Sequence, residues 1–310
     1  MMTRTISTKT TTRRRSSTSD PGESVAVAPS EALDAKEARL RELLASYDSL
    51  IVAFSGGADS AYLAWAATSV LGQSALCVTA DSPSYPDRHR QLALTVAREA
   101  GLRHEVIQTS ELDRPEYRAN PTNRCYYCKH ELYTSLTAMA SDRGVAVVAD
   151  GSNADDRGDY RPGRQAAREF GVRSPLDEVG LTKQEIRELS RRAGLPTWDE
   201  PASACLSSRI PYHSEVTAEK LRIIERAEAA VRAMGFRVCR VRHHDLNAGG
   251  RETALARLEI GRDELPRALE AEISERLVRE LRAVGYQHVT IDLQGYRMGS
   301  LNEGVPLRVV

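Results

Sequence analysis

The sequence predicts an α/β protein, with a Rossmann-like domain containing a parallel sheet over residues 31–200 and a smaller α+β domain over residues 201–310. Two observations predict this order. Up to about residue 200, apolar runs of strand length alternate with helical stretches, which is typical of a parallel sheet. Beyond it, two strands follow one another directly and a helix separates them from a third, which is typical of an α+β unit with an antiparallel sheet.

The first domain is expected to contain five or so strand–helix units. Its first strand is an apolar run that enters a Ser-Gly-Gly turn, and Gly101 ends one of its helices. Thr182 and Glu185 have the spacing of a capping box, so a helix is expected to begin there. The other expected elements are helix 31–46, strand 50–54, helix 58–71, strand 75–80, helix 87–100, strand 104–108, helix 126–142 and strand 145–149.

The second domain is expected to contain helix 217–234, strands 238–242 and 254–260, helix 264–284 and strand 288–293. At the other end of the chain, residues 1–30 are rich in Thr, Ser and Arg and have almost nothing to bury. We therefore expect a disordered tail there, with a transit-like sequence as the alternative.

The composition excludes several classes of protein. The chain has 310 residues with 43 basic and 43 acidic side chains, and this zero formal charge argues against nucleic-acid partners. No run approaches the about 20 apolar residues of a membrane helix, and no apolar run near the N-terminus is typical of a secretory signal, so we expect a cytoplasmic protein without a membrane partner. Five cysteines are too few for a disulfide scaffold, and favour metal-binding or reactive thiols.

The sharpest motif is the SGGADS string, which joins the first strand to a helix. Gly56 and Gly57 allow a tight turn, so that backbone N–H groups and the helix N-terminus point into one cradle for a pyrophosphate. The hydroxyls of Ser55 and Ser60 add donors, and Asp59 is placed to help hold Mg²⁺. A plain glycine turn is the alternative, and the whole string in this context favours phosphate binding.

Polar residues also follow two other strands of the predicted sheet. Asp81 ends the second strand, and Asn153 and Asp156 belong to a DGSNADD string after the fourth. Ligands bind at the carboxyl ends of parallel strands, so these residues are candidates for the same nucleotide site. For Asp81, a helix cap or turn is an equal alternative.

Three cysteines are candidates for metal binding or catalysis. Cys125 and Cys128 form a C-x-x-C pair, and Cys205 lies in a polar stretch that ends in Arg209. Three thiols suffice for a 4Fe-4S cluster with one open iron, whereas zinc needs a fourth ligand such as His130, and a redox dithiol is a third alternative. The nearby cation favours the thiolate of Cys205, which makes it a candidate nucleophile or else a plain loop thiol. Cys77 is expected in the core.

The SGGADS string resembles the PP-loop of ATP pyrophosphatases, which cleave ATP to AMP and pyrophosphate. Together with CYYCKHELY, DGSNADDRGDYRPG, LTKQEIR, WDEPASACLSSRIPY, RVRHH and ALARLEI, it makes residues 35–300 similar to the LarE family. LarE proteins are PP-loop sulfur transferases that convert the carboxylates of a pyridinium mononucleotide to thiocarboxylates, for the nickel-pincer cofactor of lactate racemase. The resemblance implies ATP and Mg²⁺ as cofactors, adenylation of each carboxylate and displacement of AMP by sulfur.

Two sulfur sources follow from this resemblance. In single-cysteine members the residue matching Cys205 gives up its own sulfur and becomes dehydroalanine; in three-cysteine members, which this chain resembles more closely, Cys125, Cys128 and Cys205 hold a 4Fe-4S cluster. The resemblance places the substrate phosphate on arginines of the RVR string, Arg240 and Arg242, and Arg209 follows the reactive loop. Tyr126, Glu228 and Glu259 are further candidates for the same site or for a metal.

The resemblance also implies a homo-oligomer, with a hexamer as the candidate assembly, and it leaves the sulfur donor unassigned. Two alternative functions stay open from the sequence alone. A PP-loop enzyme that thiolates tRNA would use a similar loop and cysteines, although the chain lacks a dense basic patch outside its N-terminal tail. A non-catalytic iron-sulfur or zinc sensor would bind nucleotide without turnover.

Overall fold

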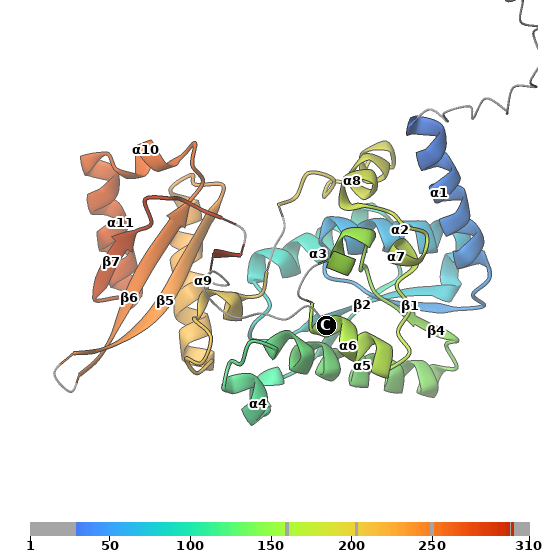
Figure 1. Ribbon diagram of the computed structural model, residues 1–310, viewed down its shortest axis with the longest axis horizontal. Coiled ribbons are helices and arrows are strands. Elements are labelled where there is room, and N and C mark those ends of the chain that lie inside the picture. The colour runs from blue at the N-terminus through green and yellow to red at the C-terminus, as the bar shows by residue number, and fades with distance from the viewer. Residues whose placement is uncertain (1–28, 159–160, 202–203, 249–250, 298, 301–310) are drawn as a thin grey trace, which may run out of the picture.

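The computed structural model describes residues 29–158, 161–201, 204–248, 251–297 and 299–300. Residues 1–28, most of the expected disordered tail, lie outside this range. The described chain forms two separate sheets in two bodies that lie side by side, and Figure 1 shows the chain entering the second body after the helix labelled α8. The predicted α/β fold class is therefore confirmed. No helix among the described residues is long and apolar enough to cross a membrane.

The first sheet is parallel and has the order β3-β2-β1-β4. Its strands are β1 (Leu50–Ala53), β2 (Ala75–Asp81), β3 (His104–Gln108) and β4 (Val147–Ala149). The expected five or so units were one too many for the described residues. A single parallel bridge joins Ala149 to Arg173, and the chain then turns at Ser174 into a helix that begins with Pro175, whose missing N–H could not continue a ladder.

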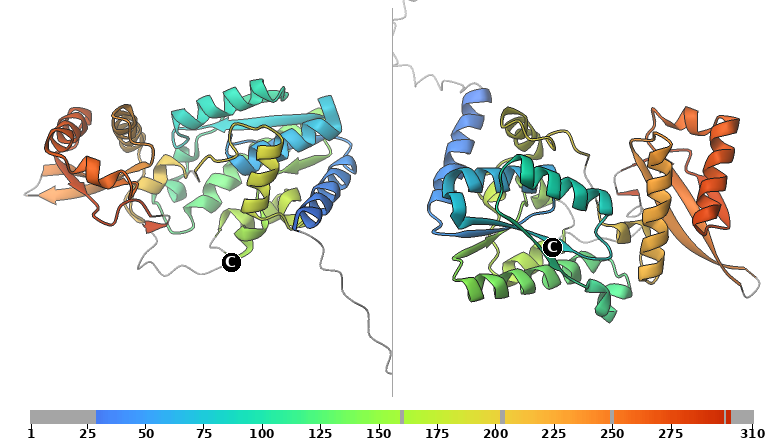
Figure 2. Two further views of the ribbon diagram at one scale, coloured as in Figure 1. Left: turned by 90° about the horizontal axis from the view of Figure 1, so that it is seen from above. Right: turned by 180° about the vertical axis from the view of Figure 1, so that it is seen from behind.

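Helices cover both faces of this sheet, because the side chains of β1 are apolar on both faces. Leu50 and Val52 pack against one group of helices, whereas Ile51 and Ala53 pack against the other. Figures 1 and 2 show these two layers. The first group comprises α1 (Pro29–Ala45), α2 (Ala58–Leu71), α3 (Asp87–Glu99), α7 (Pro175–Glu178) and α8 (Lys183–Arg192), and the second comprises α5 (Arg124–Arg143) and α6 (Gly163–Glu169).

Shorter elements lie in the connections. The predicted capping box is present at the start of α8, where the Thr182 hydroxyl accepts from the Glu185 N–H and the Glu185 carboxylate accepts from the Thr182 N–H. The connecting elements are helix α4 (Pro115–Arg118) and the 3₁₀ turns η1 (Gly72–Ser74), η2 (Glu111–Asp113), η3 (Ala154–Gly158) and η4 (Leu206–Arg209).

The second sheet has the order β5-β6-β7, with β5 (Cys239–Ala248) antiparallel to β6 (Arg251–Ile260) and β7 (His288–Ile291) parallel to β6. The expected antiparallel sheet is therefore correct for β5 and β6 and wrong for β7. The connection through α10 (Leu265–Ala268) and α11 (Ala271–Val284) carries the chain back before β7 begins, as a parallel crossover requires. Helix α9 (Ala218–Ala233) packs on the same apolar core as α11.

Two expectations for this second unit need correction. Helix 264–284 is divided into α10 and α11 rather than continuous, with α11 capped by Glu270 in an extended conformation. The first two strands are longer than expected and form one ten-residue hairpin ladder. The added residues of this hairpin, 243–248 and 251–253, are mostly polar, so they lack the apolar run from which the shorter strands were predicted.

Candidate active site

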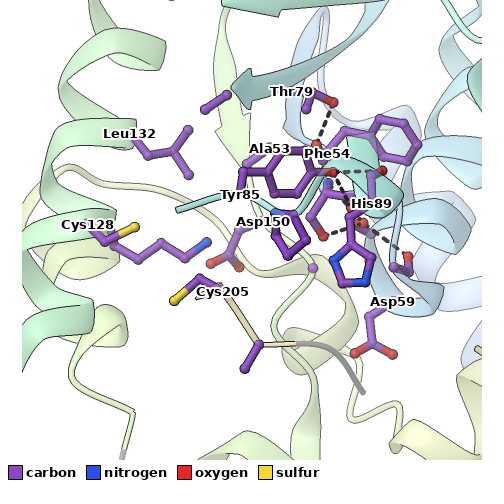
Figure 3. Close-up of a pocket in the computed structure, with 18 of the residues that line it drawn as sticks. Ala53, Phe54, Asp59, Thr79, Tyr85, His89, Cys128, Leu132, Asp150 and Cys205 are labelled. Carbon is purple, nitrogen blue, oxygen red and sulfur yellow. Dashed lines mark hydrogen bonds between the residues drawn. The ribbon is translucent and has the colours of Figure 1, made fainter. Parts of the chain in front are cut away.

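A cavity of about 480 Å³ opens where β1, β2 and β4 end, the position expected for a ligand site in a parallel sheet. Figure 3 shows side chains from several distant segments entering it. Its lining comes from the SGGADS turn, the end of β2, the loop after β4, α3 and the segments that carry two of the cysteines. The lining residues include Ser55, Gly57, Asp59, Ser60, Thr79, Tyr85, His89, Glu111, Cys128, Lys129, Asp150, Gly151, Asp156, Arg161, Lys183 and Cys205.

The SGGADS turn has the backbone conformation that the sequence predicted. Gly56 has φ +69°, and a Cβ there would lie 2.8 Å from the Cα of Ala93, so only glycine fits. Helix α2 begins after Gly57 without a side-chain cap. Its first N–H groups are therefore available to an anion, which the helix dipole also favours.

Asp59 and Asn153 meet beside this turn. The Asn153 amide donates to Asp59 Oδ2 at 3.2 Å, while Asp59 Oδ1 is buried without a partner among the described residues. Burial raises the pKa of Asp59, and the carboxylate of Asp156 raises it further, against an opposing effect of Lys183. An unpartnered carboxylate oxygen near a second carboxylate suits a divalent cation, so Asp59 and Asp156 fit Mg²⁺ by donor type.

Asp81 is placed differently from the other predicted nucleotide residues. Its carboxylate accepts from Arg90 Nε at 2.9 Å and from Gln108 Nε2 at 3.2 Å, and it does not line the larger cavity. Its described contacts are thus those of an ion pair that ties α3 to the end of the sheet.

The three candidate cysteines come from two segments. Cys125 and Cys128 lie in the first turns of α5, and Cys205 directly precedes η4. Cys128 and Cys205 line the cavity, where Figure 3 shows both thiols on the same side. Burial raises the pKa of the Cys128 thiol well above its usual value, and Glu111, Cys205 and Cys125 raise it further. The three thiols are therefore electrostatic neighbours. Within the described residues, no three His, Cys, Asp or Glu side chains are already arranged to hold a metal ion.

Three other residues considered from the sequence, His130, Tyr126 and Cys77, do not line this cavity. His130 Nδ1 accepts from Arg114 Nη1 at 2.9 Å, and the His130 ring packs edge-on against Phe170. The Tyr126 hydroxyl donates to Glu169 at 2.8 Å. Cys77 is buried in the core of the first sheet, as predicted, and burial raises its pKa to about 12.

Sequence reasoning missed Glu111 and His89. Glu111 is buried beside Cys128 and accepts hydrogen bonds from Ser84 and, at 2.9 Å, from Ser82. His89 lies on α3, and burial together with four neighbouring arginines lowers its pKa to about 4. No sequence signal could have found them, because each depends on segments that only the fold brings together.

A second cavity of about 270 Å³ adjoins the first and shares His89 and Glu200 with it. The structure brings Arg209 and Arg240 together here, with Arg88, Arg232 and Arg237 also in its lining. Arg240 lies over the ring of Tyr296, 5.1 Å from its centroid, and burial and Arg209 lower the pKa of Arg240. Arg242 does not line this cavity.

Buried acidic side chains hold two of the predicted phosphate-binding arginines. Glu228 accepts from Arg209 Nε at 2.8 Å and from Nη2 at 3.0 Å. Glu259 accepts from Arg242 Nη2 at 2.7 Å, and Arg242 also donates to the Ser208 carbonyl at 2.8 Å. Glu228 and Glu259, both candidates from the sequence, therefore fix arginines beside the Cys205 loop.

The chain is similar to known proteins along most of its length. An uncharacterized protein of Synechocystis is 43% identical over 270 residues, which is 87% of this chain and 98% of that protein. An uncharacterized protein of Methanocaldococcus jannaschii is 28% identical, over 80% of this chain and 90% of that protein. No protein-family model matches the chain.

One relative has an assigned activity. A protein of Lactiplantibacillus plantarum named pyridinium-3,5-bisthiocarboxylic acid mononucleotide synthase is 34% identical over 275 residues, which is 87% of this chain and 95% of that protein. Identity at this level along almost the whole of both chains is too extensive to reflect the nucleotide-binding loop alone. The chain belongs to the LarE family.

Proposed function

We propose that this protein is an ATP-dependent sulfur transferase that converts the carboxylates of pyridinium-3,5-biscarboxylic acid mononucleotide to thiocarboxylates for a nickel-pincer cofactor. One observation carries the proposal beyond family membership. The cavity that contains the SGGADS turn also contains the side chains of Cys128 and Cys205. A carboxylate activated at the turn is therefore near the thiols without a transfer between separate sites.

The first half of the reaction is adenylation. A substrate carboxylate oxygen attacks the α-phosphorus of ATP, the bond to the bridging oxygen of the β-phosphate breaks, and pyrophosphate leaves. The N-terminus of α2 would hold the phosphates, Asp59 and Asp156 would hold Mg²⁺, and Lys183 and Arg161, which line the same cavity, would offset the charge of pyrophosphate.

The second half replaces AMP with sulfur. A sulfur nucleophile attacks the acyl carbon and AMP leaves, which gives the thiocarboxylate directly if the nucleophile is a hydrosulfide. If it is Cys205, the product is a thioester, and loss of its α-proton with cleavage of the Cβ–S bond gives the thiocarboxylate and dehydroalanine. The raised pKa of Cys128, to which the Cys205 and Cys125 thiols contribute, supports a cluster route, since it favours a shared cationic ligand over three free thiolates.

The three thiols fit a 4Fe-4S cluster by donor type and number, because each thiolate would bind one iron and the fourth iron would have no protein ligand. Cys125, Cys128 and Cys205 would hold it. When bound, such a cluster supplies a replaceable sulfur nucleophile. Glu111 is the carboxylate among the groups that raise the pKa of Cys128.

The second cavity supports a site for the substrate phosphate. Its arginines lie next to the adenylation cavity, and His89 lies between the two. Arg240 and Arg209 would contribute to this site, with Arg237 and Arg88 as further cations from the same lining. A homo-oligomer, with a hexamer as the candidate, belongs to the same proposal, and sedimentation of the full chain would test it.

The decisive experiment uses anaerobically purified protein, Mg-ATP and the biscarboxylated mononucleotide, and records thiocarboxylate, pyrophosphate and the mass of the Cys205 peptide. Intact Cys205 with product supports the cluster route, whereas dehydroalanine establishes a single-turnover donor. The C128S variant is the matched control, because it should abolish product on the cluster route and leave a single turnover on the other. Absence of pyrophosphate release in wild type would refute the proposal.

A further inference from the structure

A buried polar network joins the two segments that carry the candidate cysteines. Arg124, immediately before Cys125, is 4% exposed, and its Nη1 donates to the Ser207 carbonyl at 2.9 Å. The Tyr117 hydroxyl and the Ser207 hydroxyl are hydrogen-bonded at 2.6 Å, and both residues are fully buried. Ser207 lies two residues after Cys205, so these bonds tie the start of α5 to the Cys205 segment.

Asn120 extends the network to the rest of this segment. Its side-chain oxygen accepts from Arg124, and its Nδ2 donates to the carbonyls of Pro211 at 2.7 Å and Ser214 at 2.9 Å. Its own carbonyl accepts from the His213 N–H at 2.9 Å. Asn120 is fully buried and has φ +53°, a conformation that asparagine adopts more readily than most residues.

Arg124 also brings a positive charge to the two segments that carry the cysteines. It directly precedes Cys125 at the start of α5, and its Nη1 donates to the backbone two residues after Cys205. A fixed guanidinium at this place stabilises negative charge on the thiols and on anything they jointly bind. Arg124 donates to the backbone of the Cys205 segment, so one residue both positions this segment and places a positive charge beside it.

We propose that Arg124, held by Asn120, is the positioning residue that sets Cys205 against Cys125 and Cys128 so that the three thiols bind one ligand together. The inference rests on the proposed function only in its premise that the three thiols bind one ligand together. An apolar cluster of Tyr117, Leu206 and Ile210 also packs beneath this segment, so the test must separate polar positioning from packing.

The test uses arsenite, which forms bonds to three thiols with release of water, on metal-free reduced protein without ATP or mononucleotide. Affinity is measured by calorimetry, and the number of thiols consumed by titration. Wild type is expected to lose three thiols, and C205S to bind more weakly through two. R124Q is expected to weaken arsenite binding by about 10- to 100-fold, the usual effect of removing a group that orients ligands, and R124K to restore part of it.

Two further variants complete the design. N120G removes the amide while glycine accepts the positive φ, so it decides the case if R124Q does not fold, and it too should weaken binding. R143Q, which removes an exposed ion pair to Glu105 at the other end of α5, should leave binding unchanged. In the C205S background, R124Q should cause no further loss of arsenite affinity. Folded R124Q or N120G protein that binds arsenite like wild type would overturn the proposal and leave adenylation untouched.

Discussion

The ion pair between Arg209 and Glu228 should make a large contribution to stability. Their side chains are 2% and 1% exposed, and two hydrogen bonds of 2.8 and 3.0 Å join them. Glu228 also accepts from the Val241 N–H at 3.2 Å and from Arg232 at 3.1 Å. The substitution E228Q would leave the Arg209 charge buried with only neutral acceptors.

The size of the effect follows from the pKa of Glu228. Against the cost of burial, Arg209 lowers this pKa from an ordinary 4.5 to about 2. Each pKa unit corresponds to about 1.4 kcal/mol, so the folded state favours the charged Glu228 by about 3 kcal/mol. The expected loss in E228Q at pH 7 is therefore about 3 kcal/mol, at the lower end of the about 3–5 kcal/mol found when a buried pair is broken.

Urea unfolding of wild type and E228Q from pH 7 to pH 3 measures this difference. Because the folded-state pKa of Glu228 is lowered, its stabilisation is present above the unfolded value of 4.5 and is lost as the pH falls toward 2. The difference in the free energy of unfolding should be constant from pH 7 to about pH 5 and shrink below. E275Q, at an exposed position of α11, is the control. A difference under about 1 kcal/mol at pH 7, the scale of a surface pair, would refute the reasoning.

Three other perturbations test the cavity. D59N should lower pyrophosphate release on the order of 100-fold, and unchanged release would count against a metal role. It should also raise the melting temperature without Mg²⁺, because the raised pKa of Asp59 means that its ionised form costs stability at pH 7. G56A should lower the free energy of unfolding in urea by about 3 kcal/mol, because its Cβ would meet Ala93 at 2.8 Å and the φ of +69° is strained for alanine. A loss under about 1 kcal/mol would contradict this. The His89 ring should stay neutral in an NMR titration until about pH 4, with folded stability falling as the pH drops below 6.5; a midpoint near 6.5 would show that the ring is exposed.

Features with a local cause were predictable from the sequence. The SGGADS turn depends on Gly56, which accepts a positive φ at a strand–helix junction, and the capping box of α8 depends on two residues three apart. The apolar strands of the first sheet were found because a buried parallel strand needs no polar face. The division of helix 264–284 and the length of the β5–β6 hairpin were missed, because tertiary packing decides both.

The candidate site shows the same limit. Arg240 and Arg242 were grouped because alternate residues of a strand share a face. Their cross-strand neighbours differ, however, since Glu259 is opposite Arg240 while Arg257 is opposite Arg242. Arg240 lines the second cavity, whereas Arg242 donates to Glu259 and to the Ser208 carbonyl. Spacing along one strand could not assign these partners, because they come from other segments.

The surroundings of Cys205 bear on which sulfur source is used. Arg209 donates to the carbonyls of Ala204 at 2.7 Å and Cys205 at 3.0 Å, and the Leu206 N–H donates to the Ser84 carbonyl at 2.8 Å. Elimination to dehydroalanine makes the Cα of Cys205 planar and moves the peptide groups on both sides, so it would act against these bonds. A thiol that keeps its carbon–sulfur bond requires no such movement. The network therefore favours a Cys205 that stays intact, the outcome that the peptide mass and the C128S control would distinguish from sacrificial transfer.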